Sequence, residues 1–293
     1  MKRNDIQYLY VAILIFLRFY INYKSENLKR RYIYPVLIIS VSIGFYYFED
    51  YLDKKEVNFS DPGVEASVFS FFYLPSSTTG IVVSHSHYSL SYSEKHEQPE
   101  WVAYELKKEH LSKNEFKRPF FEIDKKIRSS SADWRNYKNS GYDKGHLCPA
   151  ADRRFTYKAF EETFLTSNIS PQNHKFNAGI WNLLEQKTRY WATIYNNVYV
   201  ITGGILETDL KTIGYEAVSV PEYFYKIILD MSSEEPKMIG FLIPHEDSDK
   251  KLSDFVVPVD RIEKLTGIDF FPKLDDVVED RLEASSNDQE WKF

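Results

Sequence analysis

The chain of 293 residues contains a single cysteine, Cys148. One cysteine cannot form an intramolecular disulfide, and it also excludes the zinc sites that depend on several cysteines. His146 and Cys148 stand two positions apart but have no second pair of ligands, so a zinc or haem site there is disfavoured. The lone thiol gives no information about the redox compartment, because many exported proteins have no disulfides.

The chain also lacks an overall positive charge, an internal repeat and any low-complexity block. Its net charge is −6, which by itself argues against a nucleic-acid-binding protein. The charge is uneven, however: residues 101–158 hold 14 Lys and Arg against 8 Asp and Glu, a local charge of +6, whereas residues 206–293 hold 10 against 21, a local charge of −11. The basic segment is where a polyanion would bind, although the same charges could line an ordinary solvated surface.

Long apolar runs are scarce, and the one that matters, residues 32–48, has only seventeen residues without a charge. That length is at the lower limit for a helix that spans a bilayer. Tyrosines stand at both ends, and the preceding residues 24–31 are basic. We therefore predict a transmembrane helix at residues 32–48, with everything after it on the extracytoplasmic side. A buried core helix is the alternative.

Four parts of the chain follow from these patterns. Residues 1–31 form an apolar and basic segment with a candidate first membrane helix, residues 32–48 the transmembrane helix, residues 49–66 a polar linker, and residues 67–293 one folded domain. Within the domain, strand-like and helical segments alternate without a regular strand–helix–strand rhythm, which predicts an α+β fold. The strand-like segments are residues 67–75, 80–93, 100–106, 197–206, 223–231 and 237–244, and the helical ones are 157–164, 178–195 and the start of 258–274.

The segment SGYDKGHLCPAADRR, residues 140–154, gathers acids, bases and His146 in fifteen positions. Downstream lie Asn177, Glu185 and Arg189, which would share one broad stripe if a helix begins near Asn177. Each has an ordinary structural explanation. Asparagine is a preferred N-cap, and a Glu and an Arg four positions apart are a common surface pair.

Taken together, the motifs DKGH, SNISPQ, FNAGIW and LLEQ resemble those of the DNA/RNA non-specific endonuclease family, which includes endonuclease G and the Serratia-type nucleases. The order and the spacing both match, and the resemblance extends over roughly residues 70–272. It implies a ββα-metal fold, in which two antiparallel strands present a histidine and a helix presents a metal-binding asparagine.

The resemblance also implies roles for individual residues. By position, His146 is the general base and Asn177 is the direct ligand of a divalent ion, Mg²⁺ with Mn²⁺ as a substitute. Glu185 holds a metal-bound water rather than the metal, and Asn168 lies near His146 and orients the reacting groups. Arg189 is the candidate clamp on the scissile phosphate. These residue types suit phosphodiester hydrolysis, because histidine takes a proton near neutral pH and Mg²⁺ prefers oxygen ligands.

One position departs from the family pattern. Lys144 stands where the family has an arginine, so the positive charge is kept but the planar, two-pronged hydrogen bonding of a guanidinium is lost. We expect Lys144 to contact the phosphate and to support catalysis. Arg128 and Arg135 lie upstream and are candidates for supplying the missing fork to the substrate.

The function expected from the sequence is a membrane-anchored, extracytoplasmic, metal-dependent endonuclease that cleaves DNA and RNA without sequence specificity. The lipid bilayer is then a second partner. Endonuclease G-type members are often dimeric, so the resemblance allows a homodimer, but nothing in the sequence identifies a dimer surface. Two alternatives remain. The domain could be a catalytically weak module that binds polyanions, or a phosphodiesterase that acts on a lipid or a cell-wall polymer.

Overall fold

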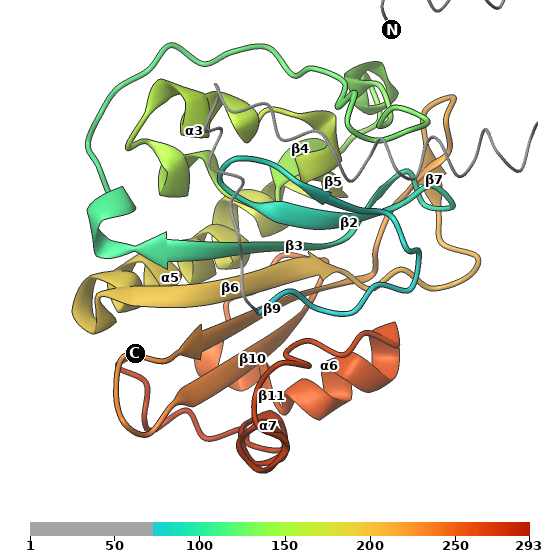
Figure 1. The fold of residues 1–293 in the computed structure, drawn as a ribbon. Helices are drawn as coiled ribbons and strands as arrows, with labels where there is room; N and C mark the ends of the chain where they lie inside the picture. The colour runs from blue at the N-terminus through green and yellow to red at the C-terminus, as the bar shows by residue number, and fades with distance from the viewer. Residues whose placement is uncertain (1–72) are drawn as a thin grey trace, which may run out of the picture. The chain divides into compact units, whose positions relative to one another are not determined.

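A seven-stranded antiparallel sheet organises residues 73–293, the part of the chain that the computed structural model describes (Figure 1). In spatial order the strands are β1 (Val82–Ser84), β2 (Ser89–Ser93), β3 (Gln98–Lys107), β6 (Asn197–Gly204), β9 (Tyr223–Asp230), β10 (Lys237–Pro244) and β11 (Val256–Val257). The helices are α3 (Tyr157–Glu162), α4 (His174–Phe176), α5 (Asn182–Tyr195), α6 (Val259–Thr266) and α7 (Asp276–Glu283). The central strands are rich in β-branched and aromatic residues, which favour extended backbone. The predicted α+β class is confirmed.

Both faces of this sheet are buried. Along β9, Phe224 and Ile228 enter one hydrophobic core together with α5, whereas Tyr225 and Ile227 enter a second core together with α6 and α7. Side chains alternate between the faces of a strand, so this arrangement requires apolar residues at successive positions. In Figure 1 the green β4–β5 pair lies beside β2 and β3, and the orange-red α6 and α7 lie beside β10.

A strand–strand–helix unit stands beside the sheet. β4 (Asp143–His146) pairs antiparallel with β5 (Ile169–Gln172), and β5 runs into α4 and α5. Gly145 makes the pairing possible, because an added Cβ would lie only 2.1 Å from Oε1 of Gln172. The unit therefore brings the end of β4 and the start of the α5 region together, as the ββα prediction requires. A third small sheet joins β7 (Thr212–Ile213) and β8 (Val218–Ser219).

The predicted regular helix starting near Asn177 is wrong in its first turn. Residues Asn177–Trp181 form a π-helical turn, and Gly179 has φ −96° and ψ −113°, outside helical values. This turn separates the short α4 from regular α-helix, which resumes at Asn182. A wide turn of this kind shifts the register, and such turns are frequent at functional sites. Asn177 therefore does not continue the four-residue stripe of Glu185 and Arg189.

Most other predicted segments are confirmed, including the strands in 80–93, 100–106, 197–206, 223–231 and 237–244 and the helices in 157–164, 182–195 and 259–266. Residues 73–75 are not a strand, and α7 was not predicted. The predicted segments 1–31, 32–48 and 49–66 lie outside the described residues, and the domain start at residue 67 stays a prediction. Within residues 73–293, no helix has both the length and the apolar character needed to cross a membrane.

Candidate active site

His146, the last residue of β4, lies against two phenylalanine rings. Its ring centroid is 5.4 Å from that of Phe121 and 5.0 Å from that of Phe164. Its Nε2 atom is enclosed and has no hydrogen-bond partner among residues 73–293. Burial, reinforced by the positive charge of Arg118, lowers the pKa of His146 to about 3. The imidazole is therefore neutral at physiological pH, which is the form that can accept a proton.

Lys144 projects from the same face of β4 as His146, because the two residues stand two positions apart on a strand. Its Nζ lies 5.5 Å from the ring centroid of Phe121, 5.9 Å from that of Trp134 and 5.8 Å from that of Tyr137. Burial lowers the pKa of Lys144, and the charge of Arg118 lowers it further. The cation is held by aromatic faces rather than by a carboxylate, so its charge remains available to an anion.

Arg118 is a site residue that the sequence reasoning missed. It is exposed, and its guanidinium carbon lies 5.8 Å from the ring centroid of Phe121 and 5.4 Å from that of Phe164, the two rings that contact His146. The run FKRPFF, residues 116–121, carried the signal, since it interleaves cations with aromatic rings as single-stranded nucleic-acid binders do. Its position beside His146 depends on a chain segment without regular structure.

Asn168 holds the backbone that follows His146. Its buried side chain accepts a hydrogen bond from the backbone N of Cys148 at 2.8 Å, and donates to the carbonyl oxygens of Cys148 at 3.0 Å and Thr163 at 2.9 Å. Both donor hydrogens of the amide are used in these bonds. Asn168 thus positions the loop after β4, and it has no donor left for a reacting group.

Asn177 presents a free amide oxygen. Its Nδ2 donates to Oδ2 of Asp143 at 3.1 Å, and Nδ1 of His174 lies 2.8 Å from the same oxygen. No hydrogen bond among residues 73–293 uses Oδ1 of Asn177. A neutral amide oxygen that no described residue hydrogen-bonds is a ligand that Mg²⁺ accepts, since this ion keeps several of its waters. The residues present therefore fit a divalent metal ion.

Four charged side chains interact between α5 and β9: Arg189, Asp152, Glu185 and Lys226. Nη1 of Arg189 lies 2.8 Å from Oδ1 of the buried Asp152, whose other oxygen accepts a hydrogen bond from the Tyr104 hydroxyl at 3.0 Å. Burial raises the pKa of Glu185, and Asp152 raises it further, whereas Lys226 and Arg189 oppose the rise. Arg189 is therefore anchored by a carboxylate, and Glu185 titrates closer to neutrality than an ordinary glutamate.

Lys226 is the second site residue that the sequence reasoning missed. It lies in the middle of β9 with no exposed surface, and its Nζ has no hydrogen-bond partner within residues 73–293. The ammonium lies 4.8 Å from the ring centroid of Trp181, and burial lowers its pKa while Glu185 and Asp152 act against that. A charged residue in a run of apolar strand residues was the available signal.

The remaining predicted arginines stand apart from His146. Arg135 is exposed, lies over the Trp134 ring at 5.2 Å and pairs with Asp133 at 2.5 Å. Trp134 also borders Lys144, so Arg135 reaches the edge of the site. Arg128 is exposed, and no ion pair or hydrogen bond joins its side chain to another residue of 73–293. The structure does not bring Arg128 into contact with the site.

Comparisons with known proteins agree on one family. DNA/RNA non-specific endonuclease sequences match residues 69–277. The human nuclease EXOG, described as mitochondrial, is 33% identical over 73% of this chain and 63% of its own length, and human mitochondrial endonuclease G is 33% identical over 65% and 69%. The chain spans 57% of the length of the Xenopus laevis EXOG nuclease. The crystal structure of the EndoG/EndoGI complex resembles this fold with a TM-score of 0.62 at 34% identity, over 67% of this chain and 87% of that one.

Proposed function

Because the chain belongs to the DNA/RNA non-specific endonuclease family, we propose that it hydrolyses phosphodiester bonds in DNA and RNA, with His146 as the general base. The observation that carries the proposal is a neutral imidazole on a face shared with two cations, Lys144 and Arg118. A neutral ring can take a proton from water, and the cations can hold the phosphate that this water attacks.

The lowered pKa of His146 belongs to the protein without substrate. Burial and Arg118 both disfavour the protonated ring. A bound phosphodiester beside the ring adds a negative charge, which favours the protonated form and raises the proton affinity of the imidazole. His146 would thus be a weak base in the empty site and a stronger one when the substrate is bound.

Asn177 is proposed to bind the divalent ion, Mg²⁺ with Mn²⁺ as a substitute, through Oδ1. The bond from Nδ2 to Asp143 fixes the amide so that this oxygen faces away from the carboxylate. When bound, the ion polarises the phosphate and acidifies nearby water. Glu185 is proposed to orient water beside the ion rather than to bind it directly, and its raised pKa makes that role sensitive to pH.

Substrate binding is proposed to depend on phosphates and not on base edges. Lys144 offers a point charge, whereas Arg118 adds the planar guanidinium that the motif itself lacks. Arg189, held by Asp152, and the peripheral Arg135 are further phosphate contacts in this proposal. Such binding is independent of sequence and weakens steeply with salt.

The decisive experiment compares the full-length chain with His146→Ala on supercoiled plasmid and single-stranded RNA, in Mg²⁺ and in EDTA. Loss of the general base should slow metal-dependent cleavage of both substrates by roughly a thousandfold. His110→Ala is the matched control, because burial also lowers the pKa of His110, to about 4, but its ring stacks on Phe155 instead of the site phenylalanines. Intact substrates with a folded wild-type chain would contradict the proposal and favour a polyanion-binding module.

We also infer that a membrane anchors this domain on the extracytoplasmic side. Support comes from the sequence alone: seventeen uncharged residues at 32–48 follow a basic segment. Carbonate extraction of cell membranes should retain the full chain and release a variant that lacks residues 32–48. If the chain lies in the membrane that bounds the cell, protease added outside intact cells should degrade the domain. Full-length chain that washes off with carbonate would rule the anchor out.

A further inference from the structure

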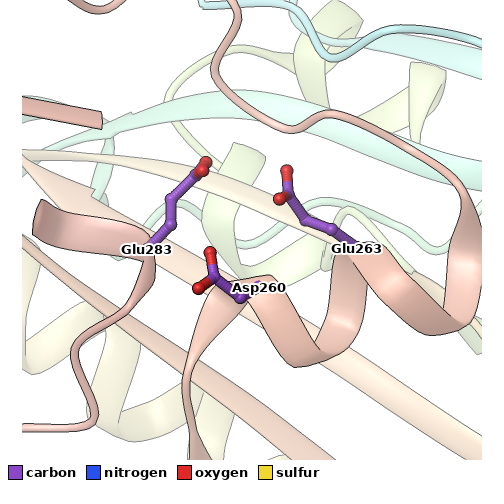
Figure 2. A group of neighbouring side chains, drawn as sticks. All are labelled: Asp260, Glu263 and Glu283. Carbon is purple, nitrogen blue, oxygen red and sulfur yellow. The ribbon is translucent and has the colours of Figure 1, made fainter. Parts of the chain in front are cut away.

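Three carboxylates converge on the side of the sheet opposite His146 (Figure 2). Asp260 and Glu263 stand one turn apart on α6, and Glu283 is the last residue of α7. One oxygen from each residue lies within 4.8 Å of the others. Figure 2 shows Glu283 pointing from its own helix toward the two side chains on α6. The two helices thus direct three negative groups at one point.

Glu283 distinguishes this group from an ordinary cluster of surface acids. Only 6% of it is exposed, and its Oε1 has no hydrogen-bond partner among residues 73–293. Buried carboxylate oxygens normally have a donor, because the loss of hydration is otherwise uncompensated. Glu263 is different, since one of its oxygens accepts a hydrogen bond from the backbone N of Phe270 at 3.0 Å. The buried oxygen of Glu283 therefore lacks a positive or donating partner.

The surrounding charges do not supply that partner. Burial, together with the negative charges of four other acids, raises the pKa of Glu283 to about 8; these acids are Glu263, Glu279, Asp269 and Asp260. The pKa of Glu279 is raised as well, first by burial and then by neighbouring acids. Within the described chain, none of the basic residues of the two helices, Arg261, Lys264 and Arg281, forms an ion pair with the cluster. The three carboxylates are therefore not neutralised by the basic residues of α6 and α7.

We propose that Asp260, Glu263 and Glu283 bind a divalent cation, Ca²⁺, at a site separate from the nuclease centre. All three donors are oxygens, which excludes the ions that prefer nitrogen and sulfur. Calcium takes six to eight oxygens at about 2.3–2.6 Å, so two oxygens on one ion lie at most about 5 Å apart. The three oxygens all lie within 4.8 Å of one another, which is inside that limit. Mg²⁺ requires shorter bonds in a stricter octahedron and is a poorer match.

Bound Ca²⁺ would join α7 to α6. Apart from this cluster, the two helices are held by a shared hydrophobic core that includes Ile262 and Leu282. The ion would neutralise the repulsion among the three acids and give the buried oxygen of Glu283 a partner. Its effect is therefore on the stability of the carboxyl-terminal helices, and phosphodiester cleavage does not depend on it.

The test uses the full-length chain carrying Asn177→Ala, which removes the proposed active-site ligand. Thermal unfolding is followed in EDTA, in CaCl₂ and in MgCl₂. Saturating Ca²⁺ should raise the midpoint by about 5 °C, and Mg²⁺ by clearly less. Adding Glu283→Gln should abolish the response. Adding Asp276→Asn, which removes an exposed acid from the other end of α7, should leave it intact.

Two results would overturn the proposal. Glu283→Gln could raise the midpoint in EDTA while Ca²⁺ has no effect on the parent, which would mean that Glu283 is simply a protonated buried acid. Alternatively, Ca²⁺ could stabilise all variants equally, which would place binding elsewhere. Should Glu283→Gln fail to fold, calorimetric titration of Glu263→Gln with CaCl₂ decides instead. The parent should bind one ion per chain at this site, and the Glu263→Gln variant should lose that binding.

Discussion

The two faces of the central sheet carry unneutralised charge of opposite sign. On the face of β4 and α5, cations rest on aromatic rings: Lys144 beside Phe121, and Lys226 4.8 Å from the Trp181 centroid. On the face of α6 and α7, carboxylates gather around Glu283 without a cation among the described residues. On the first face, no carboxylate fully neutralises the positive charge. On the second face, no cation of the described residues neutralises the negative charge.

This difference indicates which face attracts anionic ligands and which attracts cationic ligands. An aromatic face attracts a cation through its quadrupole but carries no net charge, so the positive potential still reaches an incoming phosphate. A cluster of acids has no such support and is repulsive until a cation enters it. Charge that the fold leaves unbalanced is therefore a guide to function on both faces, and each of the following predictions tests one side of the contrast.

Among the variants that follow, the largest effect is expected at Asn177, the proposed metal ligand on the proposed nuclease face, which is the face of β4 and α5. Asn177→Ala should reduce Mg²⁺-dependent cleavage by at least roughly a hundredfold, because even residues that only orient metal ligands contribute that much. Its stability should change little, since the Asn177 side chain is only partly buried. Asn168→Ala provides the contrast, because it removes three buried hydrogen bonds and should lower the free energy of unfolding by about 3 kcal/mol. Full activity in Asn177→Ala would break the assignment.

A second prediction concerns the buried cation of that face. Lys226 opposes the raised pKa of Glu185, so Lys226→Met should raise that pKa further. Glu185 must be ionised to orient water, and the ionised form is lost as the pH falls through its pKa. Cleavage by the variant should therefore drop about tenfold more at pH 6 than at pH 8.5. Lys237→Met, which removes a lysine paired with Asp230, is the control. An equal loss at every pH would indicate a packing defect only.

A smaller effect is expected for the exposed guanidinium of Arg118. Arg118→Ala should weaken cleavage several-fold at physiological salt and reduce the salt slope of DNA binding by about one. The loss should be uniform across sequences, because a phosphate contact carries no base information. Arg281→Ala, an exposed arginine on α7, should leave the slope unchanged. If Arg281→Ala changes the salt slope and Arg118→Ala does not, the assignment of the two faces is reversed.

The smallest effect is a pH dependence of stability with opposite signs on the two faces. The pKa of Glu283 is raised to about 8, so in EDTA its contribution is lost as the pH rises from about 4.5 to 8. The pKa of His146 is lowered to about 3, so its contribution is lost as the pH falls below about 6.5. Urea unfolding should show Glu283→Gln more stable than wild type by about 1 kcal/mol at pH 8 and equal near pH 4.5. His146→Ala should lose less stability than wild type between pH 6.5 and 4.

Much of the nuclease face could be predicted from the sequence because its signals are local. The order and spacing of His146, Asn177 and Glu185 lie within forty residues, and β4, β5 and α5 connect them directly. Alternating or continuous apolar residues identified the strands of the sheet, and the α+β class followed. Even here, one regular helix from Asn177 was expected, whereas Gly179 allows a π-helical turn that no periodicity announces.

Partners from distant segments could not be predicted in this way. The rings that contact His146 come from residues 121 and 164, and the lysine near Glu185 comes from a strand forty-one positions later. The amide of Asn168 looked available, but three backbone groups use it. The three acids of the opposite face belong to α6 and α7, and the helix that carries Glu283 was not predicted at all.

The sequence by itself determined the chemistry that the chain carries: a histidine, an asparagine and a glutamate in a family order, a basic segment that contains the histidine, and an acidic segment at the end. The tertiary structure decided which of these groups are buried and what they face. Burial and neighbouring charge set proton affinity, and both depend on segments that only folding brings together. For that reason His146 is neutral, and among residues 73–293 neither Nζ of Lys226 nor Oε1 of Glu283 has a hydrogen-bond partner.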